Sequence, residues 1–219
     1  MPQEGQKVRA HRVTLSQMRL LTPVAIGLVA AVACLAQAPA PVELPAEPGL
    51  YAIFDTSMGQ IVVRLYEDKA PATVKNFVAL ATGTKATLDK KGAMVKRHYY
   101  DGLTFHRVIK RFMIKTGDVN ATGSSPCGIP NQRDEIDPSL NFKESGRLAV
   151  ANTGRPNTGA CKIFITVGTP DYLTGMYTIF GQVVSGQDVA DKISQVPTAT
   201  DDKPIVSVTI KTVTIRRKP

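Results

Sequence analysis

Short apolar runs of strand length, separated by turn-forming residues, follow one another through most of this chain of 219 residues. The runs do not alternate with helices as a parallel sheet requires, and the sequence has no internal repeats. About eight strands in roughly 170 residues favour a closed antiparallel barrel, because closure leaves no unpaired edge. We therefore predict a mainly β fold, a closed eight-stranded antiparallel β-barrel. The predicted strands are 51–56, 61–65, 103–108, 112–115, 147–151, 163–167, 177–183 and 206–215.

Two segments have the periodicity of helices instead. Apolar residues at positions 74, 77, 78 and 81 share one face of a helix. Pro71 suits its first turn, and Gly83 suits its C-terminal end. A second, short helix is predicted at 188–194.

The remaining segments are predicted loops. Residues 84–96 are polar, and residues 120–138 form a long stretch rich in Gly, Pro, Asn and Ser. A loop of that length without regular structure usually carries function. In the last strand the apolar phase shifts between Ile210 and Val213, which predicts a bulge or burial on both faces.

The N-terminus resembles a targeting segment. Four basic residues precede an apolar run at 20–36, and Ala36-Gln37-Ala38 ends it. This order is typical of a secretory signal, so we expect residues 1–38 to direct export to the periplasm. An uncleaved anchor in the inner membrane is the alternative, because the run approaches the roughly 20 residues of a spanning helix and Pro39 disfavours cleavage. Translation starting at Met18 would also give a compact signal.

Composition separates this segment from the domain. Residues 39–49 contain four prolines and are predicted to be a semi-rigid linker, which leaves 50–219 as one domain. The formal net charge is +9, partly from the N-terminal segment. Without a basic stripe interleaved with aromatics, the charge indicates a solvated basic surface and not a nucleic-acid site.

Three sequence blocks resemble the signatures of the cyclophilin family, in the same order. Three blocks in this order within the domain from Tyr51 to Ile215 make the match specific. The blocks are 105–109 (FHRVI) with 112–114 (FMI) and 117–118 (GD); 148–152 (LAVAN) with 156–158 (PNT) and 164–166 (FIT); and 178–184 (TIFGQVV) with 189–198 (VADKISQVPT).

The resemblance implies peptidyl-prolyl cis–trans isomerase activity on a barrel capped by two helices, with no cofactor and no metal. Proline-containing polypeptides would bind in a shallow outer groove, cyclosporin-type inhibitors are candidate ligands, and we expect a monomer. Rotating a peptide bond meets a barrier of about 18–20 kcal/mol and leaves a lone pair on the proline nitrogen. Catalysis then needs an apolar pocket and a positioned donor. The family motif assigns the donor to Arg107, whose guanidinium is always charged.

The other site residues also follow from the resemblance. Phe112, Met113, Phe164 and Leu173 would form the floor of the proline pocket. Ala151 and Asn152 would hold the peptide extended, and Tyr172 stands where many members have tryptophan. We interpret His106 as a packed, hydrogen-bonded structural residue, and three histidines without ligand spacing do not indicate zinc.

Three residues depart from the family pattern. Lys115 and Lys162 replace glutamines, and Tyr177 replaces histidine. Lysine only donates hydrogen bonds, so Lys115 cannot orient Arg107 as glutamine does. We expect lowered activity, or a preference for acidic residues beside proline. The alternatives are a peptide-binding chaperone module with weak or no turnover and, more remotely, a basic barrel that binds anions by charge.

The two cysteines of the domain are candidates for a disulfide. After removal of the signal, Cys127 and Cys161 remain, an even number in an oxidising compartment. The family alignment places their segments side by side, so the resemblance implies a disulfide between them.

Overall fold

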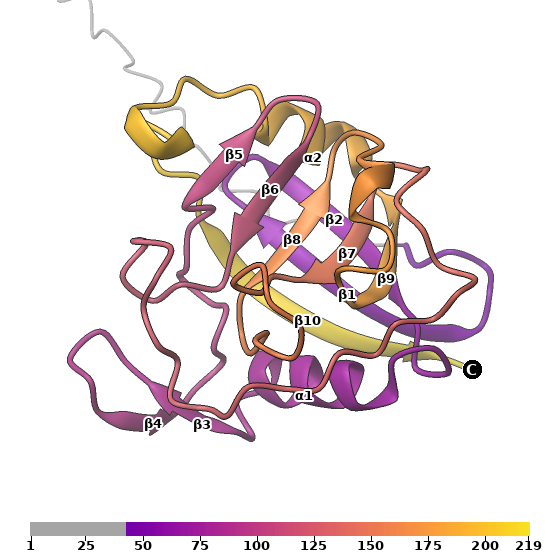
Figure 1. Cartoon of the computed structure of the whole chain (residues 1–219), viewed down its shortest axis with the longest axis horizontal. Helices are drawn as coiled ribbons and strands as arrows, with labels where there is room; N and C mark the ends of the chain where they lie inside the picture. Colours follow the sequence, from indigo (N-terminus) through magenta and orange to yellow (C-terminus); the bar gives the residue numbers. More distant parts are fainter. Residues whose placement is uncertain (1–42) are drawn as a thin grey trace, which may run out of the picture. The chain divides into compact units, whose positions relative to one another are not determined.

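The computed structural model describes residues 43–219, and the predicted signal or anchor lies outside this range. Within it, one antiparallel sheet contains eight strands in the order β10-β1-β2-β9-β7-β8-β6-β5 (Figure 1). No helix of residues 43–219 is long and apolar enough to cross a membrane. The strands are β1 (Gly49–Thr56), β2 (Gly59–Leu65), β5 (Arg107–Ile109), β6 (Met113–Thr116), β7 (Arg147–Val150), β8 (Ile163–Thr166), β9 (Ile179–Ser185) and β10 (Ile210–Lys218).

The sheet curls strongly, but the predicted closure of the barrel was overstated. The end strands β5 and β10 form no ladder with each other. The segment before β5 meets the start of β10 through the bridge from Thr104 to Thr209. Backbone hydrogen bonds from Phe105 to Val208 (3.0 Å), from Ile210 to Leu103 (2.8 Å) and from Gly102 to Ile210 (2.8 Å) accompany it. β5 has only three residues, so it is too short to extend this contact into a ladder.

The last strand begins later than predicted and contains the expected bulge. Val206 is 78% exposed and precedes β10, which starts at Ile210. Asp55 of β1 pairs with Thr212 and the next residue pairs with Ile210, so Lys211 is the extra residue. The change of apolar phase is therefore a bulge.

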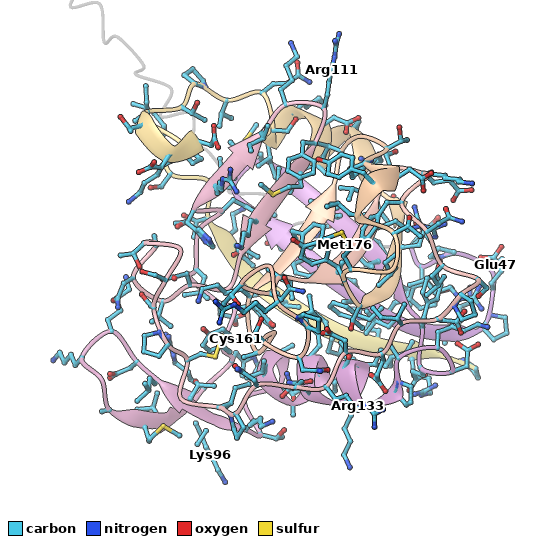
Figure 2. All side chains as sticks on the ribbon, viewed as in Figure 1. Glu47, Lys96, Arg111, Arg133, Cys161 and Met176 are labelled. Carbon is cyan, nitrogen blue, oxygen red and sulfur yellow. A yellow bond between two sulfur atoms is a disulfide. The ribbon has the colours of Figure 1, made fainter. Side chains whose placement is uncertain are left out.

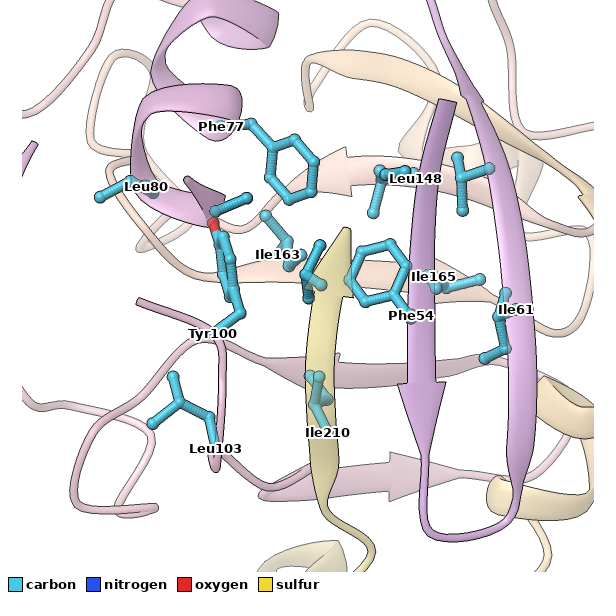
Figure 3. Packing of buried hydrophobic residues seen from close by; sticks show 14 of the residues in the cluster. Phe54, Ile61, Phe77, Leu80, Tyr100, Leu103, Leu148, Ile163, Ile165 and Ile210 are labelled. Carbon is cyan, nitrogen blue, oxygen red and sulfur yellow. The ribbon is translucent and has the colours of Figure 1, made fainter. Parts of the chain in front are cut away.

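Helix α1 (Pro71–Ala81) packs its apolar face on the sheet, as the sequence predicts. The ring of Phe77 faces that of Phe54 across the core, with 6.0 Å between centroids (Figure 3). It also lies 5.3 Å from the ring of Phe180. The carboxylate of Glu135 accepts hydrogen bonds from the first backbone amides of α1, which fastens the long 120–138 loop to the helix. The second helix, α2 (Gln187–Ile193), buries Ala190 and Ile193.

Two predicted irregular segments have more structure than expected. The 84–96 loop contains a hairpin of β3 (Ala86–Leu88) and β4 (Met94–Lys96). The Asp89 carboxylate accepts two backbone hydrogen bonds across its turn, which apolar periodicity does not reveal. The end of the predicted linker also contacts the domain, since Leu44 packs on the outer face of β1.

Candidate active site

The residues of the candidate site lie on the outer face of the sheet because side chains alternate along its strands. On β6 and β8, Ile114 and Ile165 point into the main core, while Met113 and Phe164 point the other way into a second apolar cluster. The register places Arg107 opposite Lys115, Lys115 opposite Phe164, and Phe164 opposite Ala149. The cationic side chain of Arg107 therefore lies in the same row across the sheet as the apolar residues Phe164 and Ala149.

A hollow on this face brings together most of the predicted site. We call it the first hollow. Its floor residues Met113, Phe164, Leu173 and Ala151 are all buried, and the rings of Phe164 and Tyr177 are nearly perpendicular, with 5.4 Å between centroids. The lining residues are Arg107, Phe112, Met113, Lys115, Ala151, Asn152, Phe164, Leu173 and Tyr177.

Tyr172 and Lys162 are the two predicted residues that do not line this hollow. Tyr172 lies in the short 3-10 helix η1 (Asp171–Leu173), is 71% exposed and stacks on Phe112 with 6.3 Å between ring centroids. It forms an exposed rim. Lys162 lines a second hollow, described below.

Arg107 is oriented by a residue that the sequence did not reveal. Its Nε donates a hydrogen bond to Oδ2 of Asp202 at 3.1 Å, and Asp202 lies in the 3-10 helix η2 (Thr200–Asp202). Among residues 43–219 no other guanidinium nitrogen of Arg107 has a partner. A carboxylate therefore takes the role that the family gives to glutamine, and the remaining N–H groups can serve a substrate.

The second hollow adjoins the first and shares Lys115, Ala151 and Asn152 with it. Its other walls come from residues 123–131 and 153–162. Asn152 does not offer its whole side chain to a peptide as predicted, because Nδ2 donates to the Met176 carbonyl (3.1 Å) and Oδ1 accepts from the Gly154 amide. The amide of Asn152 thus ties together the loops that form the walls.

His106 is buried as predicted, but its ring is not hydrogen-bonded to the protein. Neither Nδ1 nor Nε2 has a partner among residues 43–219. Burial, with smaller contributions from Lys115, Lys162 and Lys203, lowers the pKa of His106 from 6.5 to about 4, although Asp118 acts in the opposite direction. The histidine is therefore neutral at pH 7.

We expect this histidine to lower the stability of the fold as the pH is lowered. Between pH 6.5 and 4 the imidazole of His106 binds a proton in the unfolded chain but not in the folded chain. The free energy of unfolding therefore decreases as the pH falls through this window. The full shift corresponds to about 3 kcal/mol. Urea unfolding of wild type and His106→Gln across this range should show a flatter profile for the variant. Parallel profiles would contradict the role assigned to His106.

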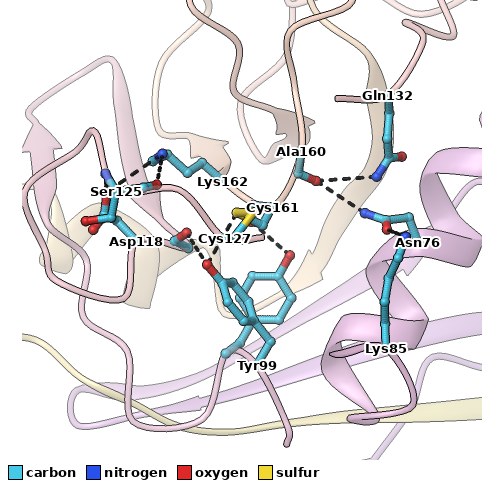
Figure 4. Close-up of a disulfide and its surroundings, with 12 residues drawn as sticks. Asn76, Lys85, Tyr99, Asp118, Ser125, Cys127, Gln132, Ala160, Cys161 and Lys162 are labelled. Carbon is cyan, nitrogen blue, oxygen red and sulfur yellow. Dashed lines mark hydrogen bonds and ion pairs between the residues drawn. A yellow bond between two sulfur atoms is a disulfide. The ribbon is translucent and has the colours of Figure 1, made fainter. Parts of the chain in front are cut away.

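The structure joins Cys127 to Cys161, beside the second hollow (Figure 4). Hydroxyls of Tyr99 and Tyr100 bond to Sγ and to the carbonyl of Cys161, at 3.3 and 3.1 Å. Gly117 passes so close that an added Cβ would lie 2.4 Å from that same carbonyl oxygen. This dense packing fixes the segment that leads through Lys162 into β8 (Ile163–Thr166).

Removing this cross-link should destabilise the domain. The two cysteines are 34 residues apart, and closing a loop of that length is worth about 3–4 kcal/mol in the chain-entropy model. We expect a Cys127→Ala, Cys161→Ala double variant to lose stability of this order in urea unfolding. Intact mass should rise by two hydrogens when the wild-type chain is reduced under denaturing conditions. An unchanged mass would show that the bond does not form.

Known proteins with similar sequences identify the family. The family described as cyclophilin type peptidyl-prolyl cis-trans isomerase/CLD matches residues 51–215. The chain belongs to the cyclophilin-type peptidyl-prolyl cis–trans isomerases. The first hollow is the candidate isomerase site of this cyclophilin, because Arg107 and Phe164, which line it, come from the blocks that carried the resemblance.

Relatives cover nearly the whole domain. Peptidyl-prolyl cis-trans isomerase B of Streptomyces anulatus is 40% identical over 173 residues, 77% of this chain and 98% of the relative. Human peptidyl-prolyl cis-trans isomerase-like 1 is 39% identical over 165 residues, 74% of this chain and 89% of the relative. A cyclophilin from Cryptosporidium parvum, also solved in the presence of the dipeptide Ala-Pro, superposes with a TM-score of 0.66 at 30% identity and covers 77% of this chain and 98% of its own.

Proposed function

We propose that this cyclophilin accelerates rotation about X-Pro bonds in exported proteins while they fold. One observation carries the catalytic part: the guanidinium of Arg107 and the apolar floor around Phe164 line the same hollow. The proline ring would lie on Met113 and Phe164. Unaided exchange of X-Pro isomers takes tens to hundreds of seconds, slow enough to limit folding.

The mechanism requires no nucleophile and no general base. As the amide twists, conjugation is lost and electron density returns to the proline nitrogen. An N–H group of Arg107, held by Asp202, would donate to that nitrogen and bind the twisted amide better than the planar one. The Ala-Pro dipeptide used with the Cryptosporidium relative supports this choice of ligand.

Export is the second part of the proposal, and the basic and apolar pattern of residues 1–38 supports it. Expression in a Gram-negative host followed by fractionation tests it. We expect a shortened, soluble periplasmic form. A full-length chain in the membrane fraction would favour anchoring by residues 20–36, and a full-length cytoplasmic chain would refute export.

A protease-coupled assay on an Ala-Pro-Phe peptide tests the isomerase activity of the purified domain. Turnover well above the uncatalysed rate is expected. The substitutions at Lys115, Lys162 and Tyr177 favour a second candidate function, a peptide-binding chaperone module. Saturable binding of the peptide without turnover would support that alternative and overturn the first proposal.

A further inference from the structure

Lys115 lies where the first and second hollows meet. It lines both, and it also borders the hollow that contains Asp201 and Asp202. Its side chain is only partly exposed, and among residues 43–219 its Nζ has neither a hydrogen bond nor an ion pair. A half-buried ammonium without an acceptor is costly and invites an anionic ligand.

The neighbouring cations differ from Lys115 because each has its own acceptor. Arg107 bonds to Asp202 at 3.1 Å. The Nζ of Lys162 donates to the carbonyl of Ser125 at 2.8 Å and lies 3.8 Å from Oδ2 of Asp118 (Figure 4).

The carboxylate of Asp118 has little capacity left for Lys115. It is buried and accepts hydrogen bonds from the amides of Ser125 and Asn120, at 2.8 and 3.0 Å. Burial first, then Lys162 and Arg107, lowers the pKa of Lys115. The positive charge is therefore in excess at this junction.

The second hollow has the size and polarity for a side chain of a peptide. Its walls carry hydroxyl and backbone groups from residues 123–125, 153 and 158, and it has no aromatic lining residue. Because it shares Ala151 and Asn152 with the proline hollow, an extended peptide placing proline in the first would carry a nearby side chain over the second.

We propose that Lys115, supported by Lys162, binds the carboxylate of an acidic residue that precedes proline, so that this isomerase prefers acidic substrates. The inference rests on the proposed function, because the proline hollow sets the position of the peptide. One added charge-assisted hydrogen bond predicts about a tenfold gain in kcat/KM.

The test uses peptides with Glu or Gln at one, two or three positions before Pro, assayed at low and at physiological salt. For at least one position kcat/KM should be about tenfold higher with Glu than with Gln, and the ratio should shrink as salt rises. In Lys115→Gln the ratio should fall towards one. Lys110→Gln, which removes a charge from the exposed β5–β6 turn, should keep it.

The outcomes separate the two proposals. Equal turnover of Glu and Gln peptides at every position, or a preference that survives Lys115→Gln, overturns the acidic subsite and leaves the isomerase proposal standing. If no peptide is turned over, the isomerase proposal fails. The affinities of the same Glu and Gln peptides then test the acidic subsite by themselves. A higher affinity for the Glu peptide that disappears in Lys115→Gln supports the subsite, and equal affinities in the wild type refute it.

Discussion

Replacing Arg107 by alanine is expected to lower kcat/KM of this cyclophilin on an Ala-Pro-Phe peptide by about 100-fold, the usual effect of removing one positioned donor. The domain should stay folded, because the side chain is 46% exposed and its pair with Asp202 is an exposed one. The protease-coupled assay and circular dichroism measure the two effects.

Two further variants make this result specific. Arg107→Lys keeps the charge but lacks the planar fork of N–H groups, so it should restore only part of the turnover. Arg133→Ala removes the same side chain from an exposed loop position that lines neither hollow, and should leave turnover unchanged (Figure 2). Wild-type turnover in Arg107→Ala would refute the assigned role.

Replacing Phe164 by alanine should cost about 3–5 kcal/mol of unfolding free energy, because it opens a cavity in a packed cluster. Only 5% of Phe164 is exposed, and its ring stacks on Phe142 at 6.0 Å and meets Tyr177 edge-on. The floor of the proline pocket would also disappear. Urea unfolding and the KM for the same peptide report the two consequences.

The partly exposed Phe112 provides the comparison for this variant. It lines the same hollow from the rim, where Tyr172 covers it, so Phe112→Ala should lose much less stability while still weakening peptide binding. A loss in Phe164→Ala no larger than in Phe112→Ala would show that the floor is not packed as described.

Local patterns predicted the approximate positions of most strands and of both helices, whereas the assignment of Met113 and Phe164 to the site came from the family resemblance. The alternation on β6 and β8 separates the core residue Ile114 from the site residues Met113 and Phe164, and the helix stripe around Phe77 appears as one buried face. The change of apolar phase between Ile210 and Val213 predicted a bulge or burial on both faces, and the structure shows the bulge, at Lys211. Hairpin β3–β4 was missed because the Asp89 side chain, and not apolar burial, holds its turn.

The sequence by itself, through its resemblance to the cyclophilin signatures, predicted most of the residues that gather at the first hollow, because residues on neighbouring strands with a two-residue period share one face of the sheet. Tyr172 and Lys162 were also predicted but do not line it. Only the tertiary structure decided how the charges around this hollow are balanced. Asp202 pairs with Arg107, which is 95 residues away in the chain. Asp118 and Ser125 bind the ammonium of Lys162 and leave that of Lys115 without an acceptor within residues 43–219. Such pairings depend on where the loops pack against the sheet. Residues so far apart in the chain form an ion pair without any periodic pattern in the sequence that would predict it.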